Sequence, residues 1–174
     1  MSLPFEAAGE ELAERWFEAA DRAWDLRDDA AAFRLFQKGA EAGNVSCQLN
    51  AGYCLDAGKG VERDEQAALR WYHEAHRQGC GSAASNIGTV WRDHDDVPRA
   101  LWWFHRALAL GDGDALLEIG RLHEKTGRLH LAERTYLRAP DQEFMSEHSR
   151  VSCRWGLRRV RRRVAGVSSP PGTG

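Results

Sequence analysis

Small and aromatic residues recur along the chain at a period of 32 to 36 residues, between stretches that are mostly polar. A pair that ends in an aromatic residue marks each period: Leu35-Phe36, Trp71-Tyr72, Trp103-Phe104 and Thr135-Tyr136. Small residues flank these pairs at fixed distances, at Ala32, Ala68, Ala100 and Ala132 before them and at Gly39, Ala75, Ala107 and Ala139 after them. Self-similarity at this period is typical of helical solenoids. The pattern predicts an all-α fold, a right-handed α-solenoid of about four antiparallel helix-turn-helix repeats with a C-terminal capping helix.

Each expected repeat consists of a first helix, A, and a second helix, B. The repeats span about residues 12–43, 44–79, 80–111 and 112–143. Asp28, Asp64 and Asp96 stand four residues before the small alanine, where a carboxylate can cap the free amide groups at the start of helix B. Glycines follow helix B at 43, 79 and 111, as expected for a residue in the left-handed conformation after a helix end.

The C-terminal region differs from the repeats. Residues 144–164 predict a capping helix, with an apolar stripe at Val151, Trp155, Val160 and Val164. A solenoid needs such a cap to cover its last apolar face. The sequence then becomes GVSSPPGTG, which lacks core residues. We therefore expect one repeat domain at 1–165 and a flexible tail at 166–174.

Residues 47–79 resemble a Sel1-like repeat. The shared positions are Gly52, Gly58-x-Gly60-Val61, Asp64, Ala68, Trp71-Tyr72, Ala75 and Gly79. The other units lack the Gly-x-Gly-Val loop and have spacings similar to tetratricopeptide repeats. Both families are α-solenoids that act as protein-interaction scaffolds and adaptors, and they carry no catalytic motif. The resemblance thus implies a protein that binds an unknown protein or peptide partner.

Composition supports this class and excludes others. The net charge of −2 argues against a dedicated nucleic-acid or membrane binder. No apolar run is long enough to span a bilayer, and the acidic N-terminus lacks the features of a secretory signal, so we expect a cytoplasmic protein. The four cysteines show neither zinc-ligand nor disulfide spacing, and Cys47 takes the place of a small core residue.

No catalytic or cofactor site is expected. His73 and His76 have the spacing of two metal ligands on one helix, but no third ligand is near in sequence, and surface histidines are the favoured interpretation. No phosphate-binding loop follows a strand, and no order of residues suggests a catalytic triad. We therefore predict a non-enzymatic protein with no metal and no cofactor.

The candidate partner site lies on the A helices, which line the concave wall of a stacked solenoid. The side chains expected to face this groove are Trp24, Asn50, Tyr53, Asn86, Thr89, Arg92 and Arg121. The asparagines would bond to a partner backbone, the arginines would bind its acidic groups, and the tyrosine and tryptophan would be apolar anchors. The alternative is that these residues form an ordinary solvated helix face. A second function is also open, because a short Sel1-like protein can serve as an immunity protein that neutralises a bacterial toxin.

An arginine cluster marks the predicted capping helix. Its members are Arg154, Arg158, Arg159, Arg161, Arg162 and Arg163. The favoured interpretation is the solvated face of a cap. One alternative is a protein partner or head-to-tail self-association with the acidic first repeat. The other is nucleic-acid contact by phosphate neutralisation, against which stands the single interleaved aromatic residue, Trp155.

Overall fold

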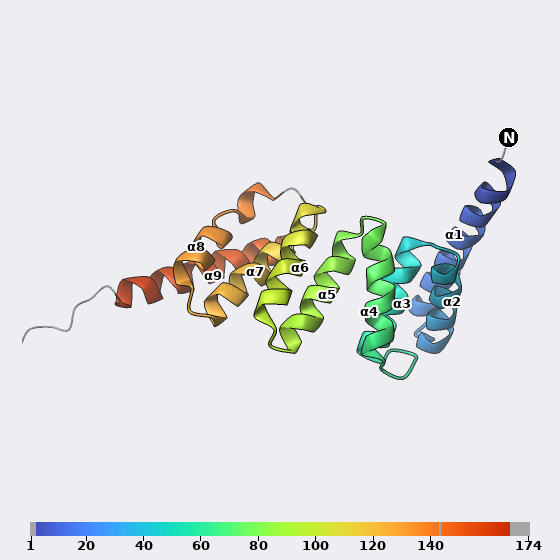
Figure 1. Ribbon diagram of the computed structural model, residues 1–174, viewed down its shortest axis with the longest axis horizontal. Coiled ribbons are helices and arrows are strands. Elements are labelled where there is room, and N and C mark those ends of the chain that lie inside the picture. Colours follow the sequence, from blue (N-terminus) through green and yellow to red (C-terminus); the bar gives the residue numbers. More distant parts are fainter. Residues whose placement is uncertain (1–2, 143, 168–174) are drawn as a thin grey trace, which may run out of the picture. The chain divides into compact units, whose positions relative to one another are not determined.

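The structure is a computed structural model that describes residues 3–142 and 144–167. Within these residues all regular secondary structure is helical (Figure 1). The helices are α1 (Leu3–Asp25), α2 (Asp29–Glu41), α3 (Val45–Ala57), α4 (Glu65–Arg77), α5 (Gly81–Asp93), α6 (Val97–Ala109), α7 (Ala115–Lys125), α8 (Leu129–Tyr136), the short 3-10 helix η1 (Ala139–Asp141) and α9 (Glu147–Val167). Of the tail expected at 166–174, Gly166 and Val167 belong to α9, and residues 168–174 lie outside the described residues.

The chain forms two compact units, residues 1–83 and 84–174. In the first unit, α2 packs on α1 and on α3, and α3 packs on α4. Its core is a cluster of fully buried small and aromatic side chains: Ala20, Ala32, Phe36, Ala40, Cys47, Ala51 and Cys54. Cys47 has no exposed surface, which confirms its predicted role as a small core residue.

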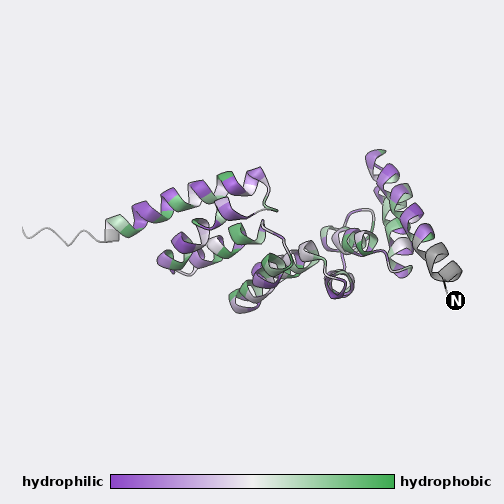
Figure 2. Cartoon of the chain, turned by 90° about the horizontal axis from the view of Figure 1, so that it is seen from above, coloured by the Kyte–Doolittle hydropathy of each residue, from purple (hydrophilic) through white to green (hydrophobic). Residues whose placement is uncertain are grey.

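The second unit contains most of α5 and all of α6 to α9. One core cluster joins α5, α6 and α7 through Ala84, Ala100, Phe104, Ala107, Ala115, Ile119 and Leu122. The other joins α7, α8 and α9 through Leu116, Leu117, Ala132, Tyr136, Ala139, Met145, Cys153 and Val160. Figure 2 shows the resulting two-sided character of the helices, with hydrophobic residues along one side and hydrophilic residues along the other.

The repeated aromatic residue fills the same place in every hairpin. Phe36, Tyr72, Phe104 and Tyr136 are each at most 2% exposed. A small residue in the preceding A helix receives the ring: a Cβ added at Gly52 would lie 2.6 Å from the Tyr72 ring, and one added at Gly88 would lie 2.9 Å from the Phe104 ring. Any larger side chain would therefore push the two helices apart. This contact explains why helix-interior glycines recur despite their low helix propensity.

The predicted aspartate caps are confirmed in three repeats. Asp28 accepts a hydrogen bond from Ala31 N, and Asp64 accepts one from Ala67 N, both at 2.9 Å. Asp96 accepts one from Arg99 N at 3.0 Å. The glycines at 43, 79 and 111 have φ of 91°, 89° and 89°, which confirms their predicted left-handed conformation at the ends of the B helices.

The loop between α3 and α4 packs against the α1–α2 hairpin of the first unit. Gly58 and Gly60 have φ of 67° and 73°, so both require the conformational freedom of glycine. Between them Lys59 places its Nζ 3.4 Å from the centroid of the Trp24 ring and 3.5 Å from Asp29 Oδ1. Val61 packs against the core cluster of this unit. The loop therefore contributes directly to the packing of α1 and α2.

The apolar stripe of α9 differs from the predicted one at Trp155. Val160 is fully buried and Val164 packs against the same cluster, as expected. Trp155, however, is 62% exposed, and the Arg158 guanidinium lies over its ring at 5.4 Å. Cys153 and Gly156 face the α7–α8 hairpin instead. Cys153 is fully buried, and a side chain larger than that of glycine at position 156 would clash with the Tyr136 ring. The placement of Trp155 in the stripe was wrong.

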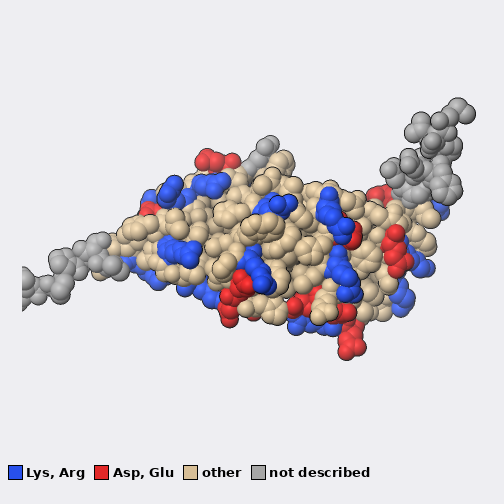
Figure 3. All heavy atoms as spheres, viewed as in Figure 1, with Lys and Arg blue, Asp and Glu red and all other residues tan. Residues whose placement is uncertain are grey.

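Charges of both signs are interspersed on the surface. On the face drawn in Figure 3, Lys and Arg side chains stand between Asp and Glu side chains over the helices. Neither sign of charge covers this face as a continuous patch, which fits the small net charge of −2. On this face, local groups of charges therefore decide where charged ligands can bind.

Candidate functional site

In the first unit, α1 and α3 bring three of the predicted site residues together. Tyr53 is 44% exposed, and its ring centroid lies 5.9 Å from that of Trp24. Trp24 is half-buried, with an edge-on contact to Phe36 at 5.6 Å and the Lys59 ammonium over its ring. Tyr53 is therefore the accessible aromatic residue, while Trp24 supports it from the core.

Asn50 lies one turn before Tyr53 on α3. Its Nδ2 donates to the backbone oxygen of Ser46 at 2.9 Å, which is a bond within its own helix. The side chain is half-buried. The amide is thus held at a defined place on the surface, and in this position only its carbonyl oxygen and second N–H are available for a partner.

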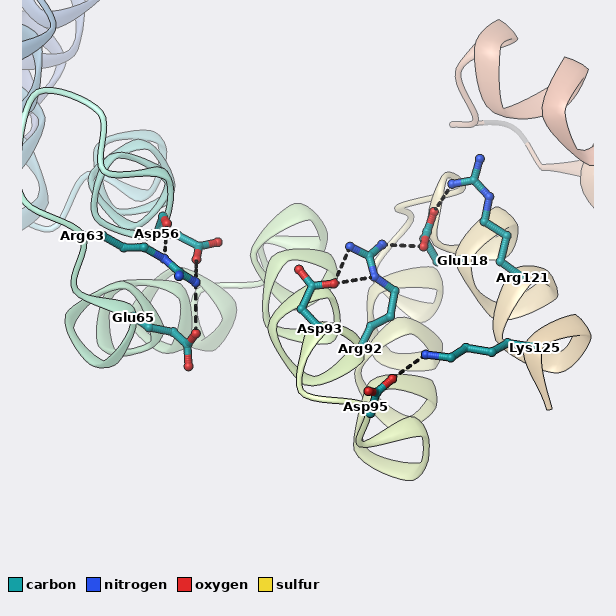
Figure 4. A network of polar contacts seen from close by, with 9 residues as sticks. All are labelled: Asp56, Arg63, Glu65, Arg92, Asp93, Asp95, Glu118, Arg121 and Lys125. Carbon is teal, nitrogen blue, oxygen red and sulfur yellow. Dashed lines mark hydrogen bonds and ion pairs between the residues drawn. The ribbon is translucent and has the colours of Figure 1, made fainter.

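In the second unit, four more of the predicted residues lie on α5 and α7. Asn86 and Thr89 are half-buried on α5. Arg92, one turn further, donates to Glu118 at 2.7 Å and to Asp93 at 2.9 Å (Figure 4). Arg121 donates to the other oxygen of the same Glu118 carboxylate at 2.7 Å. Glu118 therefore already binds both of the arginines that were expected to bind an acidic partner.

The pairing changes how these arginines can act. Burial alone would lower the pKa of Arg92, but its hydrogen bonds to Glu118 and Asp93 raise it, so its charge is fixed. A partner carboxylate would have to displace Glu118, whose side chain is only 18% exposed. Nothing in the sequence signalled the bond between Arg92 and Glu118, because it joins positions 26 residues apart.

The arginines of α9 mostly bind other parts of the second unit. Arg159 makes a two-pronged contact with Glu124, with Nε at 2.8 Å and a terminal nitrogen at 2.6 Å. Arg161 donates to Glu133 at 2.8 Å, and Arg154 donates to Glu147 at 3.1 Å. Arg163 lies 3.9 Å from Glu124, Arg158 lies over Trp155, and Arg162 is exposed. Half of the cluster thus contacts acidic side chains that are far away in sequence, on α7 and α8.

Glu124 is the centre of this arrangement. Its side chain is 9% exposed and also accepts a hydrogen bond from the Tyr136 hydroxyl at 2.7 Å. Burial would raise the pKa of Glu124, but the hydrogen bonds from Arg159 and Tyr136 and the charges of Arg159 and Arg163 outweigh this and hold the pKa below its usual range. The carboxylate is therefore ionised at neutral pH and ties α9 to the α7–α8 hairpin.

Nothing in the described part of the chain is arranged for catalysis on a metal. No group of three or more His, Cys, Asp or Glu side chains is placed there to hold a metal ion. Three of the four cysteines are buried, and burial raises the pKa of Cys47 to about 12 and those of Cys54 and Cys153 to about 11. These thiols are therefore protonated at neutral pH and are poor nucleophiles. None of the helices described could cross a membrane, because none is both long and apolar enough.

Comparison with protein families identifies Sel1 repeats in three segments. The Sel1 repeat model matches residues 25–44, 45–80 and 92–112. The second segment contains the Gly-x-Gly-Val loop on which the resemblance in sequence was based. The predicted family and the predicted all-α repeat solenoid are both confirmed.

Solved structures show the same fold at low sequence identity. A Sel1 repeat protein from Oxalobacter formigenes matches with a TM-score of 0.59 and 21% identity over 76% of this chain and 64% of its own. A protective antigen of uropathogenic Escherichia coli strains that displays an SLR fold matches with a TM-score of 0.68 and 17% identity over 90% of this chain. The match spans only 39% of that antigen. The MamA protein matches with a TM-score of 0.58 and 16% identity over 94% of this chain and 99% of its own.

Proposed function

Because this chain belongs to the Sel1 repeat family, whose fold generally serves as a scaffold for protein–protein interactions, we propose that it is a non-enzymatic adaptor that binds a protein or peptide partner through its A helices. The site includes the surface of α1 and α3 in the first unit. In the second unit, Asn86 and Thr89 on α5 and the Arg92–Glu118–Arg121 group extend the set of candidate contacts.

The observation that carries the proposal is the exposed Tyr53. Its ring is 44% exposed, and its hydroxyl makes no hydrogen bond to any residue that the structure describes. A tyrosine with an open ring face and a free hydroxyl can bury apolar area and donate a hydrogen bond at the same time. Aromatic residues of this kind are enriched among those that dominate binding energy at protein interfaces.

The support beneath Tyr53 favours binding as well. Trp24 is held by Phe36 and Lys59, so the ring against which Tyr53 rests has little freedom to move. A preorganised aromatic residue loses less conformational entropy when a partner binds. Arg92 and Arg121 are less suitable anchors, since a partner would first have to separate them from Glu118.

Affinity capture from the lysate of the host, with quantitative mass spectrometry, tests the proposal. Three forms of the full chain are compared: the wild type, the double variant Asn50→Ala/Tyr53→Ala, and the control Trp102→Ala. Trp102 is a matched control because it is also an exposed aromatic residue, at 53%, but lies on the B helix α6. Circular dichroism establishes that all three are equally helical.

We expect a partner that the wild type and Trp102→Ala retain and Asn50→Ala/Tyr53→Ala loses. If the captured partner is a secreted toxin, the immunity function is favoured over a general adaptor. An identical set of captured proteins for all three forms would reject the α1–α3 surface as the site. Catalytic turnover by the purified chain would reject the non-enzymatic function itself.

A further inference from the structure

A pocket of about 420 Å³ lies in the second unit, and none of its lining residues belongs to the set proposed for the partner. Its lining comes from α7, α8 and the segment that follows α8: His123, Leu131, Arg134, Thr135, Leu137 and Arg138. Among the described residues, no acidic side chain lines this pocket. The Thr135 hydroxyl donates to its own helix at Leu131 O, so the donors available to a ligand are the two guanidinium groups and the imidazole.

Arg134 and Arg138 differ from most arginines of this unit. Neither guanidinium has an ion pair or a hydrogen bond to any described residue. In the same unit Arg92, Arg121, Arg159 and Arg161 all bind carboxylates. Arg134 lies on α8 and Arg138 lies in the turn that follows this helix, and both line the same pocket. They give the pocket two positive charges that no described residue neutralises through an ion pair.

His123 adds a buried polar group to the same pocket. Its side chain is 9% exposed, and its Nδ1 is fully buried without a hydrogen-bond partner. An N–H at that position would be a buried donor with no acceptor, which is costly, so we assign the ring proton to Nε2. Burial lowers the pKa of His123, and the nearby Arg128 and His105 lower it further, so the ring is neutral at pH 7 and its Nε2–H is the group that can donate to a ligand.

The local sequence departs from the repeat pattern next to this pocket. Arg128 stands 32 residues after Asp96, where the other three repeats have a capping aspartate. Helix α8 consequently begins without a side-chain cap. A residue that breaks a local rule without a compensating gain in stability often marks a functional site. Here the arginine at position 128, in place of an aspartate, adds another positive charge near His123.

From this arrangement we infer that the pocket binds a phosphomonoester group. A phosphomonoester has three terminal oxygens and about two negative charges, which match two guanidinium forks and one imidazole N–H. A carboxylate has one charge and two oxygens and would leave a donor unused. The inference goes beyond the proposed function, because it concerns a different ligand and a pocket whose lining residues are not among those proposed for the protein partner.

Thermal unfolding of the full chain tests the inference with sodium phosphate as the probe. Sodium chloride and sodium acetate at equal ionic strength and pH 7.5 are the reference salts. A ligand that binds only the folded state stabilises it by RT ln(1 + L/Kd), where L is the free ligand concentration, so the Tm rises with the logarithm of L once L exceeds the Kd. The test variant is Arg134→Gln/Arg138→Gln. The control is Arg158→Gln/Arg162→Gln, which removes two exposed arginines of α9 that have no carboxylate partner among the described residues.

We expect phosphate to raise the Tm above both reference salts for the wild type and the control. The apparent affinity for phosphate should fall at least tenfold in Arg134→Gln/Arg138→Gln. Equal effects of phosphate and acetate, or an unchanged phosphate effect in that variant, would overturn the inference.

A phosphoserine peptide and its unphosphorylated form distinguish the source of the group. Each peptide is added to the wild type, to Arg134→Gln/Arg138→Gln and to Arg158→Gln/Arg162→Gln, and the Tm is measured as before. Tighter binding of the phosphopeptide than of inorganic phosphate indicates a phosphorylated partner protein, because Leu131 and Leu137, 42% and 47% exposed, are available to its flanking residues. Equal binding indicates a small phosphorylated molecule. Equal binding of the two peptides, with no response to inorganic phosphate, would reject the pocket as a phosphate site.

Discussion

At the scale of single residues, the repeats depend on close contacts between a small residue and an aromatic ring. Gly52 in α3 touches the Tyr72 ring of α4, and Gly88 in α5 touches the Phe104 ring of α6. The recurring spacing in the sequence identified the aromatic residues, and Gly52 was among the positions shared with a Sel1-like repeat. The spacing did not show which residue of a double aromatic position is buried. Trp103 is half-buried, whereas its neighbour Phe104 is 1% exposed.

Gly52→Ala should destabilise the protein by about 1–3 kcal/mol, because the added methyl group overpacks the contact with Tyr72. The matched control is Gly166→Ala. Gly166 also lies in a helix, but a Cβ there would meet no atom within 4 Å. The control should gain up to about 1 kcal/mol from the better helix propensity of alanine. Urea unfolding measures both, and a neutral or stabilising Gly52→Ala would show that the contact is not tight.

Glu124→Gln should change the pH dependence of stability. The folded-state pKa of Glu124 is below that of an unfolded glutamate, about 4.3, so its contribution is complete above that value and is lost as pH falls through the folded pKa. Between pH 6 and pH 3 the wild type should therefore lose more unfolding free energy than the variant. At pH 7 the variant should be less stable by about 1–3 kcal/mol, since Arg159 loses its charged acceptor.

Urea unfolding at several pH values makes the comparison. Glu62→Gln is the control, because Glu62 is an exposed residue in the loop before α4. That variant should follow the wild type at every pH. A parallel acid response of Glu124→Gln and the wild type would mean that Glu124 does not hold α9 in place.

At the scale of helices, the sequence predicted where three of the B helices begin and end, but it did not predict which charged residues of different helices bind each other. The aspartate caps and the glycines at helix ends act within three or four residues, and the structure confirms them. The bonds of Arg92 to Glu118 and of Arg159 to Glu124 join positions 26 and 35 residues apart. Such partners depend on the angle and register of two packed helices, which repeat spacing does not specify to the precision of a hydrogen bond.

The capping aspartates give a test across the repeats. Asp28→Ala, Asp64→Ala and Asp96→Ala should each cost about 1 kcal/mol, because each removes the same bond at the start of a B helix. Arg128→Asp should gain a similar amount, since it supplies the missing cap to α8. Asp21→Ala, at an exposed position inside α1, should not destabilise the protein. Unequal losses among the three caps would contradict their equivalence in the repeat.

At the scale of the whole molecule, the family and the fold point to binding as the function. The Sel1 repeats lie in three segments between residues 25 and 112, and the related structures confirm the all-α repeat solenoid. Sequence reasoning reached this level because a period of 32 to 36 residues is a property of the entire chain. The candidate site was predicted less completely. Tyr53 is exposed, as a binding residue should be. Trp24 instead packs beneath it, and Arg92 and Arg121 already bind Glu118.

Isothermal titration of a captured partner against the purified chain tests the central claim most directly. The wild type and Trp102→Ala should bind with the same Kd, and Asn50→Ala/Tyr53→Ala should bind at least tenfold more weakly, which corresponds to about 1.4 kcal/mol or more at an interface anchor. The loss should occur with no change in helical content. Equal Kd values for all three forms would contradict the claim that this scaffold binds its partner through α1 and α3.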